Sequence, residues 1–350
     1  MKRKIEQGEI ESLSYGSIIL GGGGGGSCQS GLDAVKASFE IGNPTIIDMK
    51  DLDEEDGMVL TASAVGAPAA KEQFVKTEDY NRIIELMERE TGKKPAAYIT
   101  NEIGGGSTFN AFIQSSKTGI PMLDAACNGR AHPLGTMGAM GLNENKEYMT
   151  VQTAAGGNDK LGNYVEIVIK GSVSKTSSLV RSAAVQAGGL VVVARNPVSI
   201  DYVRKNAAIG AISKAGEVGS AYLKGNTPLE KIENAVSVLN GSIICRGKVE
   251  EFTLNTENGL DLGSFRVSDG RSSFKMYIWN EYMALEKDEE RIYSFPDLLT
   301  TFDAETGFPI TSADVKEGME IIITGVKHNN LLLGSGMREK SGYKSIEDAT

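Results

Sequence analysis

Residues 17–29 read SIILGGGGGGSCQ, and the rest of the chain is interpreted outward from this stretch. Ser17 to Leu20 is an apolar run of strand length, and Leu32, Val35 and Phe39 follow at helical spacing, so we predict a strand, a glycine loop and a helix. Six glycines lose much conformational entropy on folding, which is reasonable where the backbone passes close to a ligand or another loop. Free amides at a helix N-terminus also suit an anion or a carbonyl oxygen. The alternative is a spacer with no function.

Short apolar runs alternate with helical patterns beyond this loop. The best helical pattern covers 78–91, where apolar residues recur with a period of 3.6 and Gly92 ends the helix. Strands are predicted at 44–49, 58–62, 96–100 and 120–123. This alternation predicts an α/β domain with a parallel or mixed sheet.

The pattern of residue types changes after Asn240. β-Branched and aromatic runs separated by Gly, Asp and Asn predict a smaller β-rich region, at 243–253, 262–267, 273–285 and 321–326. We predict an N-terminal α/β domain over 1–170, a C-terminal domain over 171–345 that begins with helices, and a frayed tail at 346–350.

The chain has 350 residues, a formal net charge of -10 and a pI near 5.0. No basic face is expected to neutralise phosphates, so nucleic acid is excluded as a partner.

The three cysteines have no zinc-binding spacing and are expected to be free thiols. No apolar run has the length of a signal peptide core or of a membrane span, so we expect a cytoplasmic protein without a membrane partner. A homo-oligomer remains open.

The glycine run matches the dinucleotide-binding pattern at Gly21, Gly23 and Gly26, and Asp48 ends the next predicted strand where a ribose-binding acid belongs. Any run of six glycines satisfies this pattern. A nucleotide-binding oxidoreductase is therefore kept as an alternative. A P-loop is excluded because Ser27 and Cys28 stand where Lys and Ser or Thr would be.

Two acidic residues follow predicted strands. Glu102 precedes Gly104, Gly105 and Gly106, and Asp124 ends the strand at 120–123. The carboxyl ends of strands are where ligands bind in open α/β sheets. Each carboxylate is a candidate general base or ligand, or alternatively a group that accepts the amides of its own loop.

Asp124 shares its loop with three further candidates. Arg130 could hold an anion or a ring carbonyl, or could instead pair with a carboxylate. His132 is one of only two histidines, so a divalent metal would need Glu102, Asp124 and His132 together. Cys28 and Cys127 lie in glycine-containing loops. A helix N-terminus would activate Cys28, while a small buried thiol is the alternative.

Several segments together resemble the S-methyl thiohydantoin desulfurase family. These are Leu20 with the glycine run, VGAP at 65–68, EIGG at 102–105, IPMLD at 120–124, GRA at 129–131 with Pro133, FPDLL at 295–299, and the residues around Asp303 to Ile310. The resemblance covers most of the chain. It implies an α/β domain followed by a β-rich domain, and a setting in hydantoin catabolism beside hydantoinase and oxoprolinase-type enzymes.

The sequence departs from the family pattern at 124–134. That pattern leads us to expect Asp-x-Asp-Gly-x-Gly-Arg-Ala-Phe-Pro-Glu, whereas the chain reads DAACNGRAHPL. The second acid and the final Glu are missing, and Cys127 and His132 are new.

We predict a hydrolase that acts on a small five-membered cyclic amide or thiohydantoin-type ring. Glu102 or Asp124 would be the base, Arg130 would hold a ring carbonyl, and His132 or Cys127 would protonate the leaving group. The expected substrate-binding residues are Gly22, Gly23, Gly24, Gly25, Cys28, Gly104, Gly105 and Asn128, with loop amides forming an electrostatic cradle. The cofactor is either none or one divalent metal. A non-catalytic partner subunit of a hydantoinase-like assembly is the other alternative.

Overall fold

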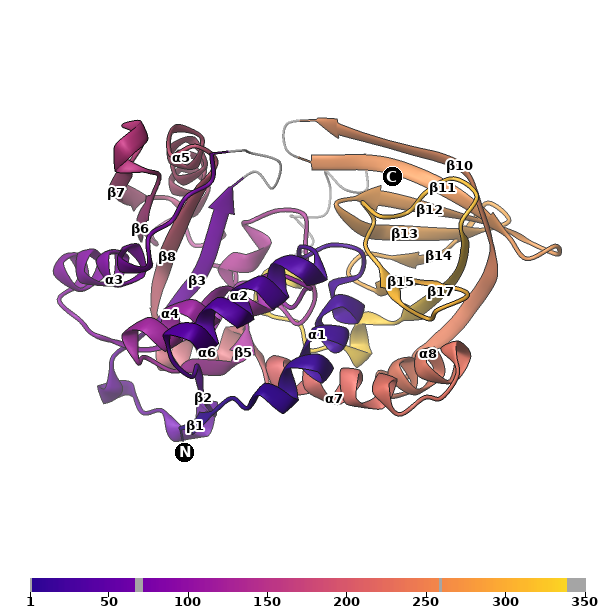
Figure 1. Cartoon of the computed structure of the whole chain (residues 1–350), viewed down its shortest axis with the longest axis horizontal. Coiled ribbons are helices and arrows are strands. Elements are labelled where there is room, and N and C mark those ends of the chain that lie inside the picture. The colour runs from indigo at the N-terminus through magenta and orange to yellow at the C-terminus, as the bar shows by residue number, and fades with distance from the viewer. Residues whose placement is uncertain (1, 67–71, 258–259, 339–350) are drawn as a thin grey trace.

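A computed structural model describes residues 2–66, 72–257 and 260–338, so the predicted tail at 346–350 lies outside the described residues. Figure 1 shows an α/β domain beside a domain built from antiparallel strands, with helix α1 between them and helices α7 and α8 along the lower side. The predicted fold class, a mixed α/β domain followed by a smaller β-rich domain, is confirmed.

The first sheet has the order β1-β2-β5-β4-β3-β8-β6-β7, with β9 beside β5. Its parallel centre runs β2-β5-β4-β3, and the remaining pairs are antiparallel. The strands are β1 Arg3–Lys4, β2 Thr45–Ile47, β3 Met58–Gly66, β4 Pro95–Thr100, β5 Met122–Ala126, β6 Thr150–Gly156, β7 Val165–Gly171, β8 Leu190–Ser199 and β9 Ala208–Ile209. This sheet therefore takes strands from both sides of residue 170.

Helices cover both faces of this sheet, because its buried strands present apolar side chains alternately to each side. Leu60 of β3 packs into a core with Ile83 and Phe112, whereas its neighbour Val59 packs with Val203 on the other side. The helices are α2 Cys28–Ile41, α3 Thr77–Thr91, α4 Asn110–Thr118, α5 Val173–Gln186 and α6 Ile200–Asn206.

The strand predicted at 17–20 is wrong. These residues form the last part of helix α1, Gln7–Gly21, which ends where Gly22 adopts a left-handed conformation with φ 57°. A short apolar run fits a buried helix as well as a strand. The helix is buried on all sides over its second half because it lies between the two domains.

Helix α1 packs against α7, Ala211–Leu223, with backbone in direct contact. A Cβ atom on Gly16 would lie 1.7 Å from the Ala215 carbonyl oxygen, and one on Gly219 would lie 1.7 Å from that of Ser12. Only glycine permits so close an approach of two helices. The ring of Tyr15 stacks on that of Tyr222 beside this contact.

The second sheet is antiparallel throughout, with the order β14-β13-β12-β11-β10-β17-β15-β16. Helix α8, Pro228–Ser237, leads into it. The strands are β10 Ser242–Glu257, β11 Leu260–Ser268, β12 Ser273–Trp279, β13 Glu281–Lys287, β14 Glu290–Ser294, β15 Leu298–Asp303, β16 Pro309–Ile310 and β17 Glu320–Val326. Val249, Phe265, Leu285 and Ile323 belong to its core.

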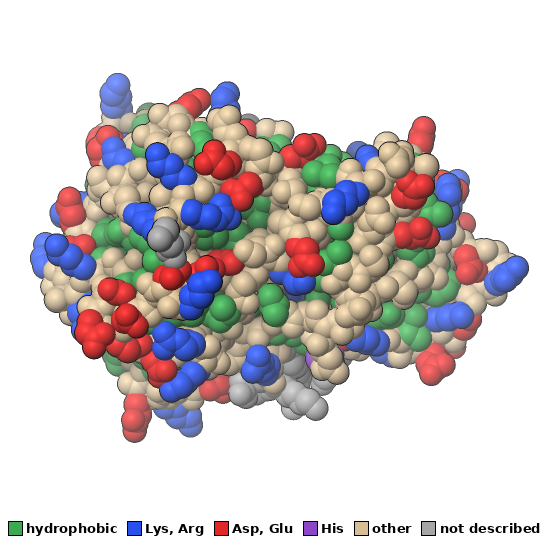
Figure 2. All heavy atoms as spheres, turned by 90° about the horizontal axis from the view of Figure 1, so that it is seen from below, with side chains coloured by type: hydrophobic (Ala, Val, Ile, Leu, Met, Phe, Trp, Pro, Cys, Tyr) green, Lys and Arg blue, Asp and Glu red, His purple; other side chains and the backbone are tan. Residues whose placement is uncertain are grey.

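Charged side chains of both signs are interspersed over the face seen from below in Figure 2. Within the described ranges, no helix combines the length and the apolar character that crossing a bilayer requires.

Candidate functional site

The segments that leave β4 and β5 meet at one edge of the sheet, because these strands are parallel neighbours. Glu102 follows β4 and His132 follows β5. Glu102 Oε2 lies 3.2 Å from His132 Nε2 and accepts the backbone N–H of His132 at 3.1 Å. Both residues are buried, with 8% and 7% of their surface exposed. The structure thus brings two of the predicted catalytic residues together.

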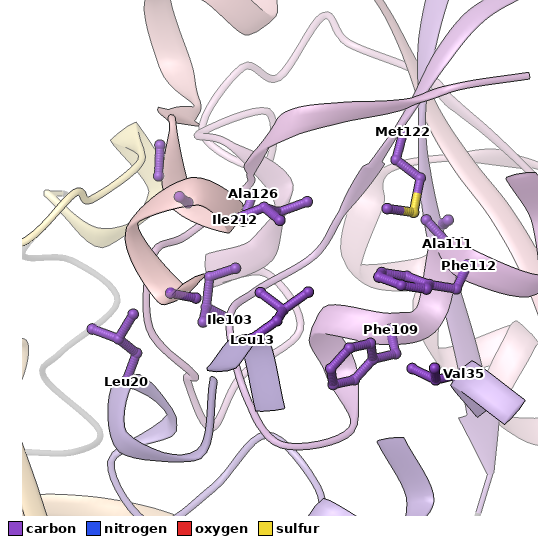
Figure 3. Packing of buried hydrophobic residues seen from close by; sticks show 14 of the residues in the cluster. Leu13, Leu20, Val35, Ile103, Phe109, Ala111, Phe112, Met122, Ala126 and Ile212 are labelled. Carbon is purple, nitrogen blue, oxygen red and sulfur yellow. The ribbon is translucent and has the colours of Figure 1, made fainter. Parts of the chain in front are cut away.

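Backbone and packing contacts hold Glu102 in position. The N–H of Ile103 donates to the Asn128 carbonyl at 3.1 Å, which ties the two segments together. The Ile103 side chain is fully buried and packs in the cluster drawn in Figure 3, which also contains Leu13 and Leu20 of α1 and Ile212 of α7. Glu102 is therefore held in position through its neighbour Ile103, which contacts the segment after β5 and packs in one cluster with α1 and α7.

Burial lowers the pKa of His132 below its ordinary value, and the neighbouring Glu102 carboxylate opposes this only in part. Desolvation disfavours the charged imidazolium, so the neutral ring is the dominant form at neutral pH. Neutral His132 can accept a proton beside Glu102, but it is poorly suited to the role of proton donor that the sequence assigned to it.

The two glycine loops pack directly on each other. The Gly25 carbonyl accepts the N–H groups of Gly106 and Ser107, both at 2.9 Å, and a Cβ on Gly25 would lie 2.6 Å from the Gly104 Cα. Gly25 also has φ 74°, in the left-handed region. The close approach expected of the glycine run is thus made to another loop.

Protein oxygens already accept four of the glycine-loop amides that were expected to form a cradle for substrate. The amide of Gly22 donates to Ile19, that of Gly24 to Gly21, and that of Gly106 to Gly25. The amide of Gly104 donates to the Thr108 hydroxyl at 3.0 Å. These four amides have protein partners and are therefore not available for the predicted cradle, and the contact between the loops is one of packing.

The C-terminal domain closes over the glycine loop from the other side. The Tyr282 amide donates to the Gly22 carbonyl at 2.8 Å, and the Ser312 amide donates to Gly23 at 2.9 Å. A Cβ on Gly24 would lie 2.0 Å from Glu281 Oε1. The loop is thus the seam between the two domains.

Glu281 at the start of β13 is a site residue that the sequence analysis missed. It is 3% exposed, and its Oε2 has no hydrogen-bond partner among the described residues. Burial raises its pKa well above the ordinary value, the charge of Glu102 raises it further, and Arg130 and the Gly25 amide oppose the rise. Two buried carboxyl groups, one from each domain, therefore interact across the seam.

No local signal in the sequence marks Glu281. It sits within the apolar run 273–285, which reads as one strand, whereas the structure splits this run into the hairpin β12-β13 at Asn280, a residue with φ 55°. Asparagine tolerates the left-handed conformation better than most residues. That turn is the only feature that could have suggested a special position.

Arg130 is fully buried and joins the two domains. Its guanidinium donates to the backbone carbonyls of Pro296 and Asp297 and lies 4.7 Å from the centre of the Phe295 ring. These guanidinium donors bind backbone carbonyls of the C-terminal domain, so Arg130 holds the two domains together. The sequence predicted instead that Arg130 would hold a substrate carbonyl.

Asp124 lies within β5 and not at its end. Its Oδ1 accepts the Ser213 N–H at 2.9 Å and its Oδ2 accepts the Ser213 hydroxyl at 2.5 Å. Ser213 is in the first turn of α7, so Asp124 satisfies the amide-rich start of that helix. The proposed role of Asp124 as a base is therefore corrected to one of anchoring α7.

The remaining candidates are also engaged by the protein. Cys127 is fully buried, its Sγ lies 3.6 Å from the Thr61 hydroxyl, and burial raises its pKa to about 12. Asn128 donates to the Met137 carbonyl at 2.8 Å. Cys28 is the first residue of α2, and burial raises its thiol pKa, opposite to the activation expected there.

The structure bears on both cofactors considered from the sequence, a divalent metal and a dinucleotide. Within residues 2–66, 72–257 and 260–338 no group of three His, Cys, Asp or Glu side chains could hold a metal, because Asp124 bonds Ser213 while Glu102 meets His132. The dinucleotide pattern is not in its required setting. It follows helix α1, whereas the fingerprint needs a strand before the loop.

A family model described as the S-Me-THD-like N-terminal domain matches residues 8–162, and one described as the S-Me-THD-like C-terminal domain matches residues 172–339. The chain belongs to this family, so the resemblance is confirmed.

The fold is similar to the crystal structure of a protein from Chromobacterium violaceum, with a TM-score of 0.74 and 17% identity over 99% of this chain and 97% of that one. At this identity the likeness shows the fold alone. No curated protein gives a significant match.

Proposed function

We propose that this member of the S-Me-THD-like family hydrolyses the carbon–sulfur bond of an S-methylated thiohydantoin, releasing a hydantoin and methanethiol. The observation that carries the proposal is the buried Glu102–His132 pair, with 3.2 Å between Oε2 and Nε2, at the carboxyl edge of the parallel strands. That edge is the usual position of ligand sites in sheets of this kind. The thiohydantoin class itself comes from the family.

Glu102 is assigned as the general base. The reaction requires water to add to the ring carbon that bears sulfur, and a carboxylate within hydrogen-bond reach of that water takes its proton. The backbone N–H of His132 and the packing of Ile103 keep the carboxylate oriented. His132, neutral because burial lowers its pKa, shields Glu102 from solvent and can share the proton.

The test is methanethiol release from S-methyl thiohydantoins, followed with a thiol reagent. We expect turnover by the wild-type protein, and the same turnover after exhaustive treatment with a chelator. A set of rings with the methylthio group replaced by methoxy or amino groups serves as a control for the bond that is broken. Release of methanethiol without hydantoin formation, or none at all, contradicts the proposal.

The same methanethiol assay distinguishes the proposed hydrolase from a non-catalytic partner subunit of a hydantoinase-like assembly. An isolated chain that releases no thiol, but that restores turnover to a hydantoinase-like enzyme when the two are mixed, would place the chemistry in the partner.

A further inference from the structure

Glu281 is a buried carboxyl group of the C-terminal domain that lies against the glycine loop. One carboxyl oxygen, Oε1, lies against the backbone of Gly24, and the carboxyl accepts from the Gly25 amide. The other oxygen, Oε2, is buried and has no hydrogen-bond partner among the described residues. A buried polar atom without a partner costs about 1–3 kcal/mol, so the bare oxygen of a buried carboxyl group calls for an explanation.

The surroundings of Glu281 distinguish it from the other buried acids. Asp124 accepts two hydrogen bonds from Ser213, and Asp297 accepts hydrogen bonds from Lys327 and His328. Glu281 instead lies on the seam that carries Glu102: its Oε1 lies against Gly24, and a Cβ on the next residue, Gly25, would lie 2.6 Å from the Cα of Gly104, two residues from Glu102. The charge of Glu102 accordingly helps to raise the Glu281 pKa. Two carboxyl groups in different environments divide into an acid and a base, since like charges close together do not both ionise.

We propose that Glu281 is the general acid of the reaction and donates its proton to the leaving sulfur, while Glu102 acts as the base. This inference rests on the proposed function. It assigns the acid role to the C-terminal domain, so neither domain alone contains the complete catalytic pair. It also supplies the proton donor that buried, neutral His132 does not provide.

The step balances with water as the only co-reactant. The water oxygen forms a bond to the ring carbon as the π pair of the carbon–nitrogen double bond moves to the ring nitrogen, and the first water proton goes to Glu102. The carbon–sulfur bond then breaks, its electron pair goes to sulfur, and the Glu281 proton joins sulfur to give methanethiol. The tetrahedral carbon becomes a ring carbonyl as its hydroxyl proton passes to the ring nitrogen. Proton transfer from Glu102 to Glu281 restores both groups.

The decisive experiment varies the leaving group. For the S-methyl ring, Glu281→Gln should lower kcat by about 10²–10⁴-fold, because an amide cannot donate a proton of the required acidity. For an S-(4-nitrophenyl) ring, whose thiolate leaves without protonation, the loss should shrink to less than about tenfold. Glu102→Gln should lose activity with both substrates, because water activation is needed in either case.

Glu286→Gln is the matched control. Glu286 lies on the same strand, its side chain is 20% exposed and it pairs with Arg291 at 3.0 Å. We expect kcat within about twofold of wild type on both substrates, as for surface substitutions generally. Equal losses of Glu281→Gln on both substrates, or no loss on the S-methyl ring, would overturn the inference while the proposed function stands. No thiol from wild type on either ring would overturn the proposed function itself.

Infrared spectroscopy keeps the inference testable if Glu281→Gln fails to fold. The wild-type protein at neutral pH should show the carbonyl stretching band of a protonated carboxyl group, and Glu286→Gln should retain it. Where Glu281→Gln folds, the band should be lost in that variant. A wild-type spectrum without a protonated carboxyl at neutral pH would contradict the acid role.

Discussion

β4 and β5, with the segments that follow them, carry similar polar residues, but these residues have different partners. Asp124 of β5 has both oxygens bonded to Ser213, and Asn128 beyond it donates to Met137. Glu102 beyond β4 instead lies against His132 and interacts with Glu281 of the other domain. The position of an acid in or just after a strand therefore does not decide its role. The groups that the rest of the fold offers to its oxygens decide it.

The largest expected effect separates these two acids by activity. Glu102→Gln should lower kcat by about 10²–10⁴-fold, because the amide cannot accept a proton from water. The amide is isosteric and can still accept the His132 N–H, so the midpoint of urea unfolding should change little. Full turnover by a folded Glu102→Gln protein would remove Glu102 from the mechanism.

The second effect tests whether the loop contact positions Glu102. Gly104→Ala adds a Cβ 2.5 Å from the Gly25 Cα, which forces the loops apart at a cost of about 1–3 kcal/mol of stability. Turnover should fall as well, because Gly104 is two residues from Glu102. Gly135→Ala is the control, since a Cβ there meets nothing within 4 Å. Unfolding midpoints of both variants, measured in urea, check the difference.

A third, converse effect concerns Asp124. Asp124→Ala leaves the Ser213 N–H and hydroxyl without their acceptor, and should lower the free energy of unfolding by about 1–3 kcal/mol. The rate per folded molecule should remain near that of wild type. If Asp124→Ala instead lost its activity without losing stability, the contrast between the two acids would disappear.

The smallest effect is expected at Cys127. Burial raises the pKa of its thiol to about 12 and leaves none of its surface exposed, so it should not react with a thiol reagent in the native state. Cys127→Ser keeps the volume and a polar contact to Thr61, and should leave kcat within about twofold of wild type. Rapid labelling of Cys127 in the folded protein would show that the segment after β5 opens.

Particular residues show how far sequence reasoning carries. The helix with period 3.6 is found at Thr77–Thr91, and the sequence alone identifies Glu102 and His132 as candidates, although not their contact. The apolar run Ser17 to Leu20 fits a strand as well as a buried helix, and in the structure it continues the helix that begins at Gln7. Glu281 gave no signal, since its partner Glu102 lies 179 positions earlier in the chain.

The sequence by itself determined the order of the two domains, the close backbone approach at the glycine run, and a polar edge after the parallel strands. Those features follow from local periodicity and from the conformational properties of single residue types. Only the tertiary structure decided which buried acids have carboxyl oxygens that no group among the described residues occupies. Whether a buried carboxyl is bonded, as at Asp124, or retains an oxygen without a partner, as at Glu281, depends on atoms brought in from distant segments.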